Sequence, residues 1–107
     1  MEITVARETV LRDFNAEEYD HFGKMAFRSK PDRTDGKPGR TFMTLWLEEG
    51  YAVLMLDRDR QVALMDEHPS VFEPHPSKWG QKGSTIMHLA RTDVRLFKKA
   101  VTIASAY

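Results

Sequence analysis

Basic side chains gather in two stretches of the sequence, and one of these stretches also holds a tryptophan. Residues 23–40 contain six basic and two acidic side chains, and residues 76–107 contain six basic and one acidic. Basic groups around an exposed aromatic ring can hold phosphates and stack a base. The candidate nucleic-acid-binding residues are Lys24, Arg28, Lys30, Arg33, Lys37, Arg40, Lys78, Trp79 and Lys82.

The same pattern admits a second interpretation. Trp79 would then close the hydrophobic core, and the cations would form a solvated loop with ordinary acidic neighbours. The 16 basic and 16 acidic side chains of the chain cancel, so its net charge gives little non-specific attraction to nucleic acid. The positions of Trp79 and Arg28 decide between the two interpretations: a solvent-facing indole beside a continuous basic surface favours nucleic-acid binding, and a buried indole with scattered cations disfavours it.

Other chemistry finds less support in the sequence. The four histidines (His21, His68, His75 and His88) include no pair at the i, i+4 or i, i+2 spacing of metal ligands. The segment GQKGST at residues 80–85 holds the residues of a phosphate loop in another order, because its lysine precedes the second glycine. The chain has no cysteine, which excludes disulfides and thiolate chemistry. The sequence therefore predicts no catalytic residue, no metal site and no cofactor.

The elements that must position these residues surround a hairpin in the middle of the chain. Residues 41–47 and 51–56 are almost continuously apolar, aromatic or β-branched, which is typical of buried strands. Gly50 can adopt the positive φ that a short hairpin turn needs. Three large side chains of the hairpin could exceed what one layer of helices covers: Phe42, Trp46 and Met55.

The remaining segments read as elements that extend or cover this hairpin. Helices are predicted over 4–14 (with an extended conformation as the alternative), 60–68 and 93–106, and further strands over 24–29 and 84–90. In the second helix Val62, Leu64 and Met65 should face the sheet, and Thr92 should cap the third. Residues 15–22 and 70–78 read as connectors, and residues 30–39 as a loop. The prediction is one α+β domain over 1–107, in which helices pack on an antiparallel sheet of four to five strands, in the order α-β-β-β-α-β-(β)-α.

Six short motifs occur in the order typical of one protein family. They are DHFGK at 20–24, AFR at 26–28, TLW at 44–46, AVL at 52–54, His68-Pro69 with Val71-Phe72, and Trp79-Gly80. Over residues 20–104 the chain resembles the MmcQ/YjbR family. The resemblance implies a two-layer α+β fold similar to frataxin (CyaY-like) domains and type III secretion chaperones, a DNA-binding label, and no catalytic residues. The loop at 30–39 is longer than the family turn, and the N-terminal segment is less regular than the family's first helix.

Three functions follow as hypotheses. The leading one is a small non-enzymatic domain that binds DNA through the basic residues and Trp79. Its rival is a protein-interaction or chaperone-like module, a monomer or a homodimer joined through its sheet. The third is a cleft near Phe22, Trp46 and Trp79 that holds a small planar ligand. The sequence lacks an apolar run long enough for a membrane span and a signal-peptide pattern, which predicts a cytoplasmic protein without membrane contact.

Overall fold

The computed structural model describes residues 1–31, 36 and 39–106, and within them the chain is an α+β protein of two layers. Six antiparallel strands form one sheet in the order β1-β2-β3-β4-β6-β5. The strands are β1 (Ala16–His21), β2 (Lys24–Ser29), β3 (Thr41–Trp46), β4 (Tyr51–Met55), β5 (Phe72–Pro74) and β6 (Ser84–His88). The α-helices are α1 (Ile3–Asp13), α2 (Arg58–Glu67) and α3 (Val94–Ser105), and the 3-10 helices are η1 (Lys78–Lys82) and η2 (Leu89–Arg91).

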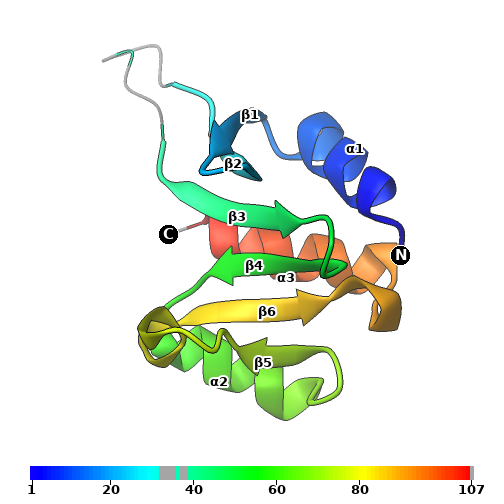
Figure 1. Ribbon diagram of the computed structural model, residues 1–107, viewed down its shortest axis with the longest axis vertical. Coiled ribbons are helices and arrows are strands. Elements are labelled where there is room, and N and C mark those ends of the chain that lie inside the picture. Colours follow the sequence, from blue (N-terminus) through cyan, green and yellow to red (C-terminus); the bar gives the residue numbers. More distant parts are fainter. Residues whose placement is uncertain (32–35, 37–38, 107) are drawn as a thin grey trace.

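The predicted central hairpin is confirmed as β3 and β4, the two middle strands (Figure 1). Its turn ends at Gly50, whose φ of 75° is the left-handed conformation that glycine adopts without a steric cost. Apolar side chains of both strands fill the interior on one face: Met43, Leu45 and Leu54 are fully buried. Figure 1 shows α3 behind these strands, with no described helix in front of them.

A β-bulge changes which side chains of β3 reach the core. The pairing of β2 with β3 shifts between Phe27 and Arg28, so that Phe27 faces Met43 and Arg28 faces Thr41. Phe42 is thereby fully buried in the core cluster. The expectation that Phe42 adds to an uncovered apolar surface is wrong, because the bulge brings its ring into the core.

Two connectors predicted from the sequence are strands at the edges of the sheet. Residues 16–21 form β1, although the acidic and aromatic composition of 15–22 predicts a connector. Arg28 on the neighbouring strand pairs with Glu17, and Arg7 of α1 pairs with Glu18, so the carboxylates are neutralised from both sides. The short strand β5 falls within the other predicted connector and ends at Pro74, which suits an edge strand.

The three predicted helices form, with differences at their ends. The N-terminal segment is helical over 3–13, which decides against the extended alternative. Asp57 caps α2, but Val62 points outward at 37% exposure because Gln61 and Leu64 take the buried face. At the start of α3 the side chain of Asp93, and not the predicted Thr92, accepts the hydrogen bond from Leu96 N. No helix in the described ranges is long and apolar enough to span a lipid bilayer.

Candidate binding cavity on the open face of the sheet

The face of the sheet opposite the helices carries a mixed set of small and aromatic side chains. Paired residues of neighbouring strands lie on the same face, so Ala26, Thr44, Val53 and Ile86 form one row across four strands. These four residues are at most 5% exposed, although none of the described helices covers them. We call this side of the sheet the open face.

Trp46 is the central ring of the open face. Its indole Nε1 donates a 2.9 Å hydrogen bond to Thr44 Oγ1, which fixes the ring along the strand. The ammonium group of Lys24, on the next strand, lies 4.3 Å from the ring centroid, within the range of a cation–π interaction. Tyr51 and His75 flank the same indole at centroid distances of 5.5 and 5.3 Å. The ring is therefore held by contacts from four sides.

The loop between β5 and η1 forms the opposite wall. Ser77 N donates to His75 Nδ1 at 3.2 Å, so this nitrogen carries a lone pair, and the Ser77 hydroxyl, 2.9 Å away, must donate to it as well. Ser77 Oγ in turn accepts from Trp79 N and caps η1. When neutral, the imidazole of His75 then carries its proton on Nε2.

Close backbone packing holds η1 against the sheet. A Cβ added to Gly80 would lie 1.8 Å from His75 O, so only glycine allows this approach. The fully buried Gln61 of α2 donates from Nε2 to Gly80 O at 2.9 Å and to Ser84 O at 3.2 Å. Through Gln61, helix α2 thus holds the backbone of η1 in place, and this fixes the position of Trp79.

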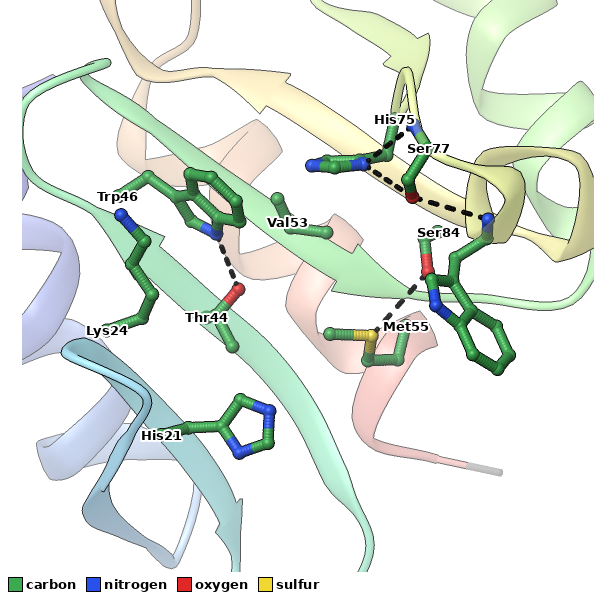
Figure 2. Close-up of a pocket in the computed structure, with 10 residues that line it drawn as sticks. His21, Lys24, Thr44, Trp46, Val53, Met55, His75, Ser77 and Ser84 are labelled. Carbon is green, nitrogen blue, oxygen red and sulfur yellow. Dashed lines mark hydrogen bonds between the residues drawn. The ribbon is translucent and has the colours of Figure 1, made fainter.

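Between these walls lies a cavity of about 410 Å³ (Figure 2). Thr44, Val53 and Met55 form its floor, His21 and Lys24 lie on one side, and His75 and Ser77 lie on the other. Trp46, Trp79 and Ser84 complete the lining. An apolar floor between aromatic rings, with a few polar groups at the rim, suits a flat ring compound.

Trp79 is 54% exposed, so the interpretation of this residue as a lid over the core is wrong. Its backbone belongs to η1, and the ring is flanked by two lysines of the same short helix. The ammonium groups of Lys82 and Lys78 lie 4.8 and 5.6 Å from the ring centroid. Trp79 and Lys24 line the same cavity, although 55 positions separate them in the sequence.

Three lysines near the cavity lack carboxylate partners in the described ranges. Ion pairs in the described ranges use the acidic side chains near the helices and the outer strands, as in Arg7–Glu18, Lys98–Asp13 and Lys99–Glu67. Within the same ranges Lys24, Lys78 and Lys82 have no carboxylate partner within 4.0 Å. The rim therefore presents unpaired positive charge to the solvent.

At neutral pH Tyr51 beside the cavity is uncharged, and the carboxyl groups in the ion pairs on the helical side are ionised. Burial, reinforced by Glu49 and Glu73, raises the pKa of Tyr51, so its hydroxyl beside Trp46 stays protonated. On the helical side, hydrogen bonds from Arg12 and Lys98 lower the pKa of the Asp13 carboxyl to about 2. Hydrogen bonds from Arg7 and Lys99 lower the pKa values of Glu18 and Glu67 in the same way.

The structure brings together four of the nine residues predicted to bind nucleic acid: Lys24, Lys78, Trp79 and Lys82. Arg28 instead bonds Glu17 at 2.6 Å and lies over the Tyr19 ring. Arg40 donates to backbone carbonyls, among them Ala104 O. Lys30 is exposed beyond the other end of β2, about 20 Å along the strand from Lys24. Arg33 and Lys37 lie outside the described residues.

Two of the three residues predicted to line a cleft for a planar ligand do line the cavity. Trp46 and Trp79 both line the cavity, whereas Phe22 does not and is 92% exposed. Reasoning from the sequence missed the roles of His21, His75 and Ser77. The alternation of side chains on β1 and the Ser77 cap before η1 are the signals that could have identified them.

The described part of the chain holds no group of three or more His, Asp or Glu side chains placed to bind a metal ion. No family model matches the chain, and searches of curated proteins and of solved structures found no match either. The likeness to the MmcQ/YjbR family therefore stays a prediction. The physical arrangement of the cavity is what can be used to infer function.

Proposed function

We propose that this protein is a non-enzymatic binding domain for single-stranded nucleic acid, and that one base enters the cavity on the open face. The observation that carries the proposal is a cavity with an apolar floor that is lined by Trp46, Trp79 and Lys24. Two further lysines, Lys78 and Lys82, lie beside the Trp79 ring, and within the described ranges none of the three lysines has a carboxylate partner. Aromatic rings stack bases of any sequence, and lysines beside them contact the backbone phosphates.

The architecture supports single strands over duplex DNA. A double helix hides the flat faces of its bases, so rings that lie in a shallow cavity cannot reach them. An unpaired base can rotate out and enter. Antiparallel sheets with exposed aromatic side chains are used for this purpose by RNA-recognition domains, which is an analogy of architecture and not of ancestry.

Binding of an oligo(dT) of about 12 nucleotides tests the proposal, because known sites span about 4 to 16 nucleotides. Fluorescence anisotropy at low ionic strength should show saturable binding, and the logarithm of the affinity should fall by about 0.7 per phosphate contact for each unit of log salt. Trp79→Ala should weaken binding about 5- to 100-fold, whereas Trp79→Phe should retain most of it.

Val94→Ala is the matched control, because Val94 is exposed at 42% on α3, behind the sheet, and should not contact the ligand. The proposal fails if oligo(dT) shows no binding at low ionic strength. It also fails if Trp79→Ala and Val94→Ala bind with the same affinity as the unmodified protein.

The volume of the cavity favours a second candidate of related chemistry. About 410 Å³ lies within the roughly 300 to 1,000 Å³ of small-molecule sites, so a free planar anion such as a mononucleotide could be the ligand. The two candidates differ in one measurement. If thymidine monophosphate competes as well per molecule as oligo(dT), the ligand is the free nucleotide.

The protein-interaction hypothesis has its own observation, the uncovered sheet face with Trp46 and Met55 partly exposed. Light scattering across a range of concentrations tests the homodimer, which should change the measured mass as protein is diluted. Assignment to the MmcQ/YjbR family and a cytoplasmic location fit the proposed function and stay predictions with it.

A further inference from the structure

The turn between β1 and β2 carries a phenylalanine that neither the backbone nor the core requires. His21 pairs with Lys24, so Phe22 and Gly23 alone form the turn. Their φ values are 53° and 83°, both in the left-handed region. Two-residue turns of this kind favour Asn-Gly, and a bulky side chain at the first position is an outlier.

The contact of the apolar Phe22 side chain with water is also unfavourable. It is 92% exposed, the highest value among the large hydrophobic side chains that are exposed in the described ranges. A ring kept in a strained conformation and in contact with water contributes little to folding. Strain of this kind is commonly found where a residue takes part in binding, and the position of Phe22 is consistent with such a role.

Phe22 lies between two residues that line the cavity, His21 and Lys24. Its ring contacts the imidazole of His21 edge to face, with centroids 4.7 Å apart and planes at 74°. His21 itself extends from β1 toward the cavity floor in Figure 2. Phe22 therefore stands at the rim of the cavity, on the side of Lys24, with most of its ring free.

We infer that Phe22 is a further ligand-binding residue, which stacks the base adjacent to the one held between Trp46 and Trp79. The inference rests on the proposed function, since it needs a strand of at least two nucleotides. A free aromatic face accepts any base, and the neighbouring ammonium of Lys24 is placed to meet the phosphate that links the two nucleotides. The turn and the cavity would together form one binding track that runs from the β1–β2 turn across β3 and β4 to η1.

The substitution Phe22→Asn separates binding from folding. It creates the Asn-Gly pair that this turn favours, so the melting temperature should rise by a few degrees, about the effect of relieving one strained residue. Affinity for oligo(dT) should fall about fivefold or more, the lower range for the loss of one stacked base. Phe22→Tyr keeps an aromatic ring and should retain the affinity of the unmodified protein.

The outcomes distinguish this inference from the proposed function. If Trp79→Ala loses binding to oligo(dT) while Phe22→Asn does not, the role of Phe22 is overturned and the proposed function stands. If the unmodified protein does not bind oligo(dT), both are overturned. Binding to phosphatidylglycerol vesicles that Phe22→Asn abolishes, without a change toward oligo(dT), would assign the ring to a lipid surface and would also overturn the inference.

Discussion

The ammonium group of Lys24 lies 4.3 Å from the centroid of the Trp46 ring, on the neighbouring strand of the open face. One contact thus joins a cation and an indole that belong to different hairpins. Because Lys24 has no carboxylate within 4.0 Å in the described part of the chain, its charge remains available to an anion. This pairing makes charge and stacking available at the same point of the surface.

Lys24→Gln should therefore change the salt dependence of binding more than it changes stability. The loss of one phosphate contact should lower the slope of log affinity against log salt by about 0.7. The cation–π contact contributes about 1 kcal/mol or less at such a site, so the free energy of unfolding should fall only slightly. Anisotropy titrations of oligo(dT) at several salt concentrations measure the slope. Lys30→Gln, at the far end of β2, is the control, and an equal slope in both variants would contradict the prediction.

Arg40→Ala should behave in the opposite way to Lys24→Gln. The guanidinium of Arg40 donates to Thr41 O, Met55 O and Ala104 O, so it connects the sheet to the end of α3. Loss of these bonds should reduce the free energy of unfolding by about 1 kcal/mol, and oligo(dT) affinity should stay unchanged. Urea denaturation measures the first quantity and anisotropy the second. If Arg40→Ala weakened oligo(dT) binding without lowering stability, the prediction would be contradicted, and Arg40 would be assigned to the binding surface.

Gly80→Ala and Gly50→Ala form a pair that separates a steric clash from backbone strain. A Cβ on Gly80 would meet His75 O at 1.8 Å, so this variant should lose more than about 2 kcal/mol of stability and should displace Trp79. Gly50 has a φ of 75° and open space around its Cβ position, so its variant should lose only about 1 kcal/mol. Chemical denaturation compares the two. Equal losses would show that the loop before η1 can move aside.

Stability should fall in acid because several carboxyl groups have lower pKa values in the folded state. Asp13 has a pKa of about 2 owing to Arg12 and Lys98, and the pKa values of Glu18 and Glu67 are also lowered. A group with a depressed folded pKa contributes its full stabilisation above its unfolded pKa, about 4, and loses it as the pH falls. Melting temperatures should therefore decline as the pH falls from about 5 to about 2. Asp13→Asn should decline less steeply, and an unchanged profile would contradict the role of this carboxyl.

Local sequence patterns determine much of the fold. The apolar run over 41–56, the glycine at its turn and the periodic apolar side chains of 93–106 determine the central hairpin and α3, because strands and helices each bury residues at a fixed spacing. The edge strand β1 could not be predicted in this way. Its carboxylates are acceptable in a strand only because Arg28 and Arg7 lie beside them after folding.

The tertiary structure alone decided which residues form the cavity. The sequence identified Lys24 and Trp79 as candidates, but their meeting depends on the strand order, which places β3 and β4 between them. The bulge at Phe42 and the packing of Gly80 against His75 set which rings are buried and which face solvent. Local patterns determine which elements form, whereas contacts between distant segments determine the surface that they present. The cavity forms where distant segments meet, and for this reason it could not be predicted from the sequence.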